Sequence, residues 1–317
     1  MSGGAAGASV SPFVSVAEAG ADARPVLAHL FGADYSARAI TPQRADLAPN
    51  VVRAALPRFS SYDAGHKTDL ADWQVVDHGD AGAIRAHTWD EAFGLIERHA
   101  SVALESGAFV VGLGGDHSVT WPIASAALAA TRRRTGSDTA RLGILQLDVH
   151  HDVRALDHGP SNGTPMRGLL EAGLVLGGDI AQVGIHPFGN QRAASQYCDE
   201  AGIVTYSLDD VAERGTDVVA RGALLSLDGV DAIHLTVDID VLDRAFAPGT
   251  AAALPGGLTP RELLHIVEVI CADHRVASID VVEFDPERDV ASVTAYAAAN
   301  VVMVALAAVA RRAAHPN

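Results

Sequence analysis

The chain has 317 residues, of which 49% are hydrophobic and 20% are charged. This composition is typical of a globular protein with enough apolar material for a large core. Its 23 Lys and Arg residues against 39 Asp and Glu residues give a formal charge of -16, which argues against the basic surface that nucleic acid binding requires.

Cysteine usage and apolar stretches indicate the compartment. The two cysteines, Cys198 and Cys271, are not part of a C-x-x-C pair, so neither a disulfide framework nor a thiolate metal site is expected. The first residues contain no basic region followed by an apolar stretch, so no secretory signal is expected. The longest apolar stretch, residues 295–310, is shorter than the roughly 20 residues of a membrane span and predicts a buried helix. We therefore expect a cytoplasmic protein that does not bind membranes.

Residues 1–20 are rich in Gly, Ala and Ser and are expected to be flexible, and we find no linker that divides residues 21–317 into more than one domain. From residue 108 onward, short apolar runs that predict β-strands alternate with longer stretches that predict helices, and a further predicted helix precedes the first of these strands. The predicted strands are 108–113, 142–149, 180–185, 203–206, 232–237 and 276–282. The predicted helices are 89–106, 119–134, 191–200, 259–273 and 290–312. Apolar strands separated by helices predict an α/β fold with a parallel sheet covered on both faces.

Acidic side chains follow the predicted strands at the point where each strand ends. Asp148, Asp238 and Glu283 each lie at or near the carboxyl end of an apolar strand, which is the edge where open parallel sheets bind ligands. Six residues in three short motifs offer metal ligands: His117 in Gly-Gly-Asp-His-Ser, Asp148, His150 and Asp152 in Asp-Val-His-His-Asp, and Asp238 and Asp240 in Asp-Ile-Asp.

Four carboxylates and two imidazoles from three strand ends are expected to bind a pair of hard divalent cations. In an extended segment, side chains two residues apart point to the same side, so the members of each motif can converge. A single D-x-D motif is more often a solvated turn or a helix cap, but three motifs together would bury acids at a high desolvation cost unless cations are bound. Oxygen-rich ligation without thiolate favours Mn²⁺ and leaves Fe²⁺, Co²⁺, Ni²⁺ and Zn²⁺ open.

Further motifs follow in order within residues 113–289: Asn-Gly-Thr-Pro at 162–165, Val-Asp-Ile-Asp-Val-Leu-Asp at 237–243, Ala-Pro-Gly-Thr at 247–250, Gly-Gly-Leu-Thr at 256–259 and Val-Val-Glu-Phe-Asp-Pro at 281–286. With the motifs above, they resemble the ureohydrolase family, which includes arginase, agmatinase, guanidinobutyrase and formimidoylglutamase. The resemblance implies a three-layer α/β/α sandwich with a central, mainly parallel sheet, two Mn²⁺ ions per chain, and a homo-oligomer such as a trimer or hexamer. It also implies that a hydroxide between the ions attacks an amidine or guanidine carbon and that a C–N bond is cleaved.

The resemblance also assigns roles to individual residues. His117, Asp148, Asp152 and Asp240 are implied to share the pair of ions, and His150 and Asp238 complete the ligand set. Asp152 is further implied to accept a hydrogen bond from the hydroxide. Glu283 matches the family glutamate that faces the cationic C–N group of the substrate, where a carboxylate can orient the reacting carbon. The alternative for Glu283 is a strand-end acid that pairs with a nearby arginine such as Arg288.

Two departures from the family pattern affect these expectations. Arginases and agmatinases have a histidine where this chain has Asn162, and an amide cannot titrate, so proton transfer to the leaving amine must pass to another group or to solvent. His151 and His158 lie nearby in the sequence. The N-terminal third lacks the usual Gly/Arg-rich segment of the family, and residues 31–35 followed by 49–53 offer only a degenerate equivalent.

Arg154 follows the D-x-H-x-D motif by two positions and predicts a carboxylate at the far end of the substrate. Asn162, Thr164 and Arg167 are assigned to the same cleft. An arginine there would repel the ammonium of agmatine, whereas N-formimidoyl-L-glutamate carries an amidine and two carboxylates. The chain therefore looks more like a formimidoylglutamase of histidine degradation than an arginase. The alternative for Arg154 is an ion pair with Asp157 that supports a loop.

Other functions remain open at this level. Agmatinase or guanidino-acid ureohydrolase activity would release urea. A metal-dependent deacetylase would bind one zinc ion and rely on pairs of histidines, and an inactive relic would be expected to have lost some of the six ligands.

Overall fold

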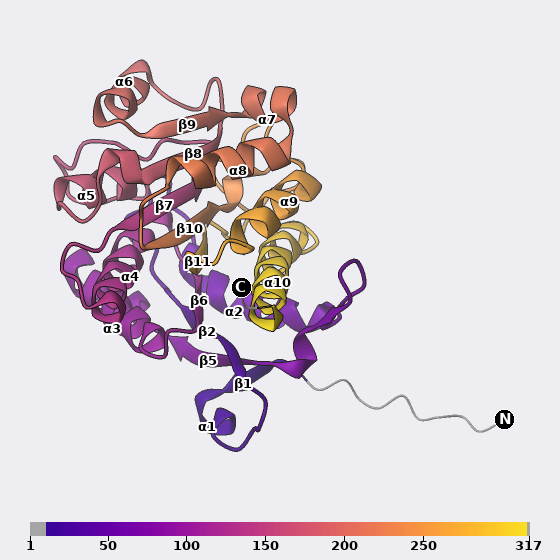
Figure 1. Cartoon of the computed structure of the whole chain (residues 1–317). Coiled ribbons are helices and arrows are strands. Elements are labelled where there is room, and N and C mark those ends of the chain that lie inside the picture. Colours follow the sequence, from indigo (N-terminus) through magenta and orange to yellow (C-terminus); the bar gives the residue numbers. More distant parts are fainter. Residues whose placement is uncertain (1–10, 316–317) are drawn as a thin grey trace.

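The computed structural model describes residues 11–315. Its centre is a nine-stranded sheet with the order β1-β5-β2-β6-β11-β10-β7-β8-β9, in which every neighbouring pair is parallel (Figure 1). The strands are β1 (Phe13–Ser15), β2 (Val26–Gly32), β5 (Gln74–Asp80), β6 (Phe109–Leu113), β7 (Leu142–Leu147), β8 (Ile180–Ile185), β9 (Val204–Ser207), β10 (Ala232–Asp238) and β11 (Val276–Val282). A separate antiparallel hairpin consists of β3 (Tyr62–Asp63) and β4 (Thr68–Asp69).

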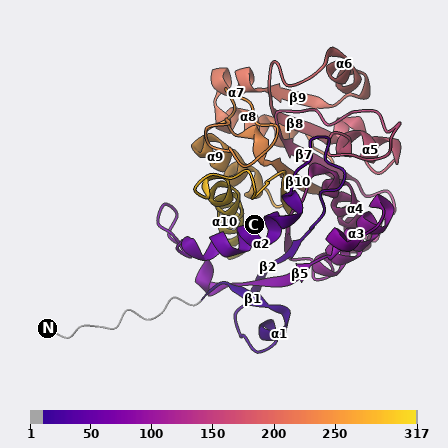
Figure 2. The same cartoon turned by 180° about the vertical axis from the view of Figure 1, so that it is seen from behind.

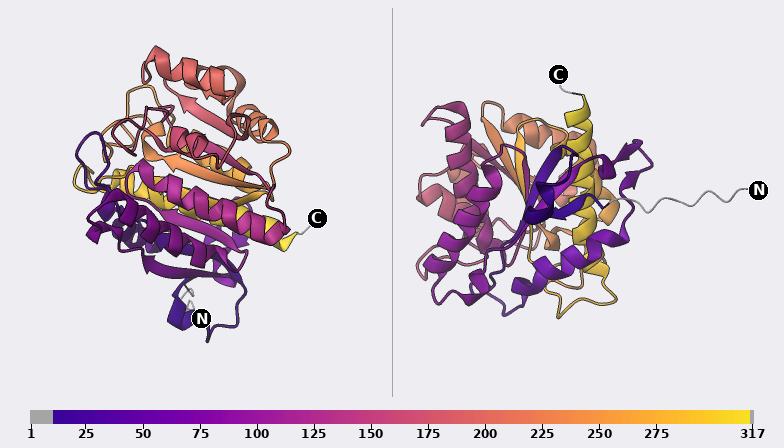
Figure 3. Two further views of the ribbon diagram at one scale, coloured as in Figure 1. Left: turned by 90° about the vertical axis from the view of Figure 1, so that its left-hand side faces the viewer. Right: turned by 90° about the horizontal axis from the view of Figure 1, so that it is seen from below.

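Helices cover both faces of the sheet, as Figures 1 and 2 show from opposite sides. One face carries α2 (Ala48–Ala55), α7 (Leu208–Arg214), α8 (Thr216–Ser226), α9 (Pro260–Cys271) and α10 (Val293–Ala314). The other face carries α3 (Trp89–Leu104), α4 (Thr120–Thr135), α5 (Pro165–Glu171) and α6 (Arg192–Ala201). The short helix α1 (Val16–Ala19) follows β1 at the edge of the sheet. The views in Figure 3 show the three layers, which confirm the predicted α/β/α sandwich.

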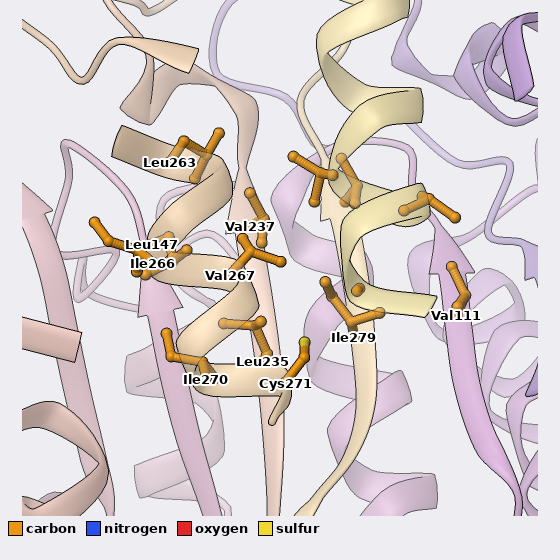
Figure 4. Packing of buried hydrophobic residues seen from close by; sticks show 14 of the residues in the cluster. Val111, Leu147, Leu235, Val237, Leu263, Ile266, Val267, Ile270, Cys271 and Ile279 are labelled. Carbon is orange, nitrogen blue, oxygen red and sulfur yellow. The ribbon is translucent and has the colours of Figure 1, made fainter. Parts of the chain in front are cut away.

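The packing of α9 shows how the sequence builds these layers. Thr259 caps the helix through the backbone N–H of Glu262, whose carboxylate accepts a hydrogen bond from the Thr259 N–H in return. Apolar residues at helical spacing then face the sheet, where they meet Leu147 of β7 and Leu235 of β10 (Figure 4). Each such side chain contributes about 1.5–3 kcal/mol when fully buried.

The helix α10 is long and apolar enough to cross a membrane by length and composition alone. However, 72% of its most apolar window is buried within the protein. It packs against α2 and α9 over the sheet. The predicted buried C-terminal helix is therefore confirmed.

The N-terminal part differs from the expectation. Of the segment predicted to be flexible, residues 1–10 lie outside the described residues. Residues 13–19, by contrast, form β1 and α1, because Phe13 and Val14 pair with Val75 and Val76 at the edge of the sheet. The strands β2 and β5 were not predicted, since a histidine interrupts the first and β5 ends in polar residues.

Candidate metal centre

The six predicted ligands meet at the carboxyl edge of the sheet because their strands are neighbours in the order β6-β11-β10-β7. His117 opens a single turn after β6, and Asp148 directly follows β7. Asp238 is the last residue of β10, and Asp240 lies in the turn after it. Glu283 directly follows β11, the strand that lies between β6 and β10. Parallel strands thus deliver all these groups to one place, as the sequence predicted.

The side chains form two adjoining clusters that share Asp148. In the first, His117 Nδ1 lies 2.8 Å from Asp152 Oδ2 and 3.2 Å from both Asp148 Oδ2 and Asp238 Oδ2. In the second, His150 Nδ1 lies 3.4 Å from Asp148 Oδ1 and 3.0 Å from Asp240 Oδ2. Each cluster could hold one cation, and Asp148 contributes a carboxylate oxygen to both clusters.

Backbone geometry near these clusters is unusual. Asp152 and Glu283 have φ angles of 53° and 67°, in the left-handed region that residues other than glycine rarely adopt. Conformations of this kind cost of order 1–3 kcal/mol and gather at functional sites. A Cβ on Gly115 would overlap the carbonyl oxygen of Tyr35, so only glycine lets the His117 loop pass this closely.

The electrostatics fit a cation at each cluster. Burial raises the pKa of Asp238 well above its ordinary value, and the neighbouring Asp240 adds to the effect. The pKa of His150 is raised to about 12 against the cost of burial, because Asp240 and Asp148 stabilise its protonated form. His117 Nδ1 and Asp240 Oδ1 are buried without hydrogen-bond partners. A buried ring nitrogen and a buried carboxylate oxygen without hydrogen-bond partners are suitable ligand atoms for divalent cations. Such cations would take the place of protons between these groups.

Stability of the metal-free protein is expected to fall as pH rises from about 5 to about 8. Burial raises the pKa of Asp116 and Asp152 to about 6 and that of Glu283 to about 8. The folded state therefore holds more protons than the unfolded state in this range, so the free energy of unfolding decreases with pH. The raised pKa values of His117 and His150 act in the same direction.

The measurement is the thermal midpoint of chelator-treated protein at pH 5 and at pH 8. Saturating Mn²⁺ should remove most of the difference, because bound cations replace the lost protons. A pH effect caused by repulsion between surface charges would instead persist with Mn²⁺ present, so the metal distinguishes the two causes. A midpoint that is equal or higher at pH 8 without metal would contradict the assignment.

Glu283 is held by three donors. Its Oε1 accepts hydrogen bonds from the backbone N–H of His117 at 2.6 Å and from Asn162 Nδ2 at 3.2 Å, and its Oε2 accepts one from Gln43 Nε2 at 2.7 Å. Arg288 instead donates to Asp285, so it is not the partner of Glu283. Among the described residues, no arginine or lysine pairs with this carboxylate, which the three donors hold in position.

A cavity of about 210 Å³ opens onto this site. It is lined by His150, Asp152, Asn162 and Glu283, and also by Arg154. Arg154 is exposed and forms no ion pair with Asp157 or with any other described acid. It also lines an adjoining cavity.

The remaining predicted contacts lie further from the ligands. Arg167 lines only the adjoining cavity, where it donates to Glu171 and lies over the Tyr197 ring. Thr164 is buried, and its hydroxyl is bonded within the loop to Ser161, so the structure does not bring it to the cavity.

Other neighbouring side chains also have partners. His151 points away from the ligands toward Gln182 and Ser195.

Loop 36–46 contributes three residues that sequence reasoning missed. Ile40 and Thr41 line the cavity. Gln43 does not line it, but donates a hydrogen bond to Glu283. No motif marks them, because the loop is irregular and its contacts are distant in the sequence.

Comparison with known proteins places these observations in context. The profile of the arginase family matches residues 27–308. The formimidoylglutamase of Halalkalibacterium halodurans is 37% identical over 280 residues, which cover 86% of this chain and 84% of that protein. The crystal structure of formimidoylglutamase from Bacillus subtilis superposes with a TM-score of 0.84 at 31% identity and covers 94% of this chain and 90% of its own. The structure of Trypanosoma cruzi formiminoglutamase with Mn²⁺ has a TM-score of 0.81 at 22% identity, covers 90% of this chain and 94% of its own, and shares the fold.

Proposed function

The chain belongs to the arginase family, and we propose that it hydrolyses N-formimidoyl-L-glutamate to L-glutamate and formamide in histidine degradation. One observation carries the proposal: Glu283 and the six candidate ligands adjoin a cavity that is also lined by Arg154, and neither Glu283 nor Arg154 forms an ion pair within the described part of the chain. A substrate with a cationic amidine at one end and carboxylates at the other matches both features.

The residues at the ligand clusters would hold two Mn²⁺ ions per chain. When bound, a pair of divalent cations lowers the pKa of a water between them and supplies a hydroxide at neutral pH. The inferred ligands are His117, Asp148, Asp152, Asp238, Asp240 and His150, and the use of Mn²⁺ is supported by the Trypanosoma cruzi relative. We also infer a cytoplasmic homo-oligomer, either a trimer or a hexamer.

The protein groups then have separate tasks. Glu283 accepts hydrogen bonds from the formimidoyl nitrogen and keeps the carbon in place, while Asp152 accepts the hydrogen of the attacking oxygen. Oxygen adds to the carbon, the bond to the glutamate nitrogen breaks, and that nitrogen gains a proton, which balances water plus substrate against formamide plus glutamate. Asn162 cannot supply the proton, and its amide instead contacts Glu283.

The substrate is tested with purified, Mn²⁺-loaded protein on a panel of compounds. We expect formamide from N-formimidoyl-L-glutamate and little urea from agmatine, 4-guanidinobutyrate or L-arginine. Urea without formamide would support the ureohydrolase alternative instead. Two bound ions with no turnover on any compound would indicate a relic, and a single zinc ion with acetate release would indicate a deacetylase.

Replacing Arg154 by Ala is expected to raise KM for N-formimidoyl-L-glutamate about 10-fold or more with a smaller effect on kcat, because a hydrogen bond to a charged group is worth about 1.5–3 kcal/mol. Steady-state kinetics measure the split. Arg221→Ala, which removes an exposed arginine of α8 on the other face, is the matched control and should leave both constants unchanged. An unchanged KM in Arg154→Ala would show that this residue does not hold the substrate.

A further inference from the structure

A chain of buried polar side chains runs behind His117, on the side of its ring away from the carboxylates. His117 Nε2 lies 3.0 Å from Thr236 Oγ1, which lies 3.2 Å from Thr120 Oγ1. Thr120 Oγ1 donates to Asp280 Oδ2 at 2.9 Å, and His234 Nε2 lies 3.0 Å from the same oxygen. All five side chains are at most 1% exposed, so water does not compete for these contacts.

The fold brings this chain together. His234 and Thr236 are two residues apart on β10, so their side chains share one face of the sheet. The register with β11 places Asp280 opposite Thr236. Thr120 is the first residue of α4, which covers that face. Three elements therefore supply buried polar groups, which are costly unless they are bonded. Asp280 Oδ2 is bonded twice within the chain, whereas its Oδ1 has no partner among the described residues.

The hydrogens in the chain can be assigned from its acceptor end. Asp280, as a carboxylate, only accepts, so the Thr120 hydroxyl donates to it. The Thr236 hydroxyl can donate to Thr120 Oγ1 or to Asp280, and in either case Thr236 Oγ1 is left to accept from His117. The His117 ring therefore carries its hydrogen on Nε2. Its Nδ1 faces the carboxylate clusters, 2.8 Å from Asp152 Oδ2, and would offer its lone pair to a cation that replaces the proton there.

The ionised state of Asp280 is consistent with this direction. Burial alone would raise its pKa, but the neighbouring His234 holds the pKa below its ordinary value. The negative charge at the far end of the chain favours hydrogen donation along it from His117.

We propose that Asp280, Thr120 and Thr236 form a hydrogen-bond relay that fixes the tautomer and ring orientation of His117 for metal binding through Nδ1. They are positioning residues, since none of them touches the cavity. A carboxylate that orients a metal-binding histidine changes metal affinity by about 10- to 100-fold in other proteins. Here the carboxylate acts through two threonine hydroxyls, and the inference does not depend on which substrate is used.

The experiment compares Thr120→Val, which removes the central hydroxyl at nearly constant volume, with Thr131→Val. Thr131 lies in the same helix and is 3% exposed, but its hydroxyl bonds only to the backbone oxygen of Ala127. Mn²⁺ dissociation constants are measured by chelator competition, with the thermal midpoint of the metal-free variants recorded alongside. We expect about 10-fold or greater weakening in Thr120→Val, less than about 2-fold in Thr131→Val, and recovery in Thr120→Ser, which restores the hydroxyl.

Two further measurements keep the proposal open to refutation if Thr120→Val folds poorly. Asp280→Asn preserves the shape of the side chain and removes the charge, and it should also weaken Mn²⁺ binding about 10-fold or more. In the diamagnetic Zn²⁺-loaded wild type, ¹⁵N chemical shifts of the histidine rings should show His117 protonated on Nε2. Equal Mn²⁺ affinity in Thr120→Val and Thr131→Val, or a His117 ring protonated on Nδ1, would overturn the relay.

Discussion

Asp152→Asn is expected to lower kcat on N-formimidoyl-L-glutamate by about 10²–10⁴-fold, the range over which positioned acid–base groups contribute. Asp152 Oδ2 lies in the first ligand cluster, 2.8 Å from His117 Nδ1. An amide cannot accept the hydrogen of the attacking oxygen as a carboxylate does, and it is a weaker metal ligand. Asparagine tolerates the φ of 53° at this position, so the substitution tests the carboxylate rather than the backbone.

The kinetics should be paired with metal analysis, because the residue has two inferred tasks. A variant that keeps two Mn²⁺ ions but loses turnover would assign the loss to orientation of the attacking oxygen. One that also loses an ion would assign part of it to ligation. Asp157→Asn changes an exposed acid of the following loop and should behave like the wild type. Wild-type turnover by Asp152→Asn would show that the carboxylate of Asp152 has no part in catalysis.

The convergence of the candidate ligands could be predicted from the sequence because each motif is local. His150 and Asp152 follow Asp148 within one extended segment, and Asp240 follows Asp238. Their convergence needed only the rule that parallel strands present their carboxyl ends at one edge. The structure adds that Asp148 is shared by the two clusters.

The surroundings of Glu283 and His117 could not be predicted in this way. Gln43 reaches Glu283 from 240 residues away, and Asp280 is tied to Thr120 across 160 residues. Polar residues of this kind carry no spacing signal, since their partners are chosen by strand order and by the path of a loop. The strand β5 was missed for a related reason: its Asp77 and Asp80 pair with Arg53 of α2 and mask the apolar pattern.

The role of Asn162 also became interpretable only in three dimensions. Its Oδ1 accepts a hydrogen bond from the Ile40 N–H, and its amide contacts Glu283. The residue therefore ties loop 36–46 to the carboxylate, at the position where the family resemblance led us to expect a histidine. Loop 36–46 and Asn162 are parts of one arrangement around Glu283.

Glu283→Gln is expected to lower kcat/KM for N-formimidoyl-L-glutamate by about 10²–10⁴-fold, because removing one partner of a buried ion pair costs about 3–5 kcal/mol. Glu283 is 2% exposed, and no arginine or lysine of residues 11–315 pairs with it, so the substrate amidinium would be its counter-charge. The amide has nearly the same shape and can still accept from the His117 N–H. Gln43 can rotate its own amide and offer Oε1, which is buried without a partner, to the new N–H₂ group.

The fold and the metal centre should therefore survive this substitution while catalysis does not. Two Mn²⁺ ions per chain and an unchanged or higher thermal midpoint are expected, since the pKa of Glu283 is raised to about 8 by burial and a neutral side chain is easier to bury. Glu287→Gln, an exposed acid four residues further along the same loop, is the control. Loss of metal in Glu283→Gln would make the residue a ligand, and retention of kcat/KM would leave the substrate cation to be bound by another group. A selective loss of kcat/KM with both ions in place is the result that only a carboxylate facing the reacting carbon explains.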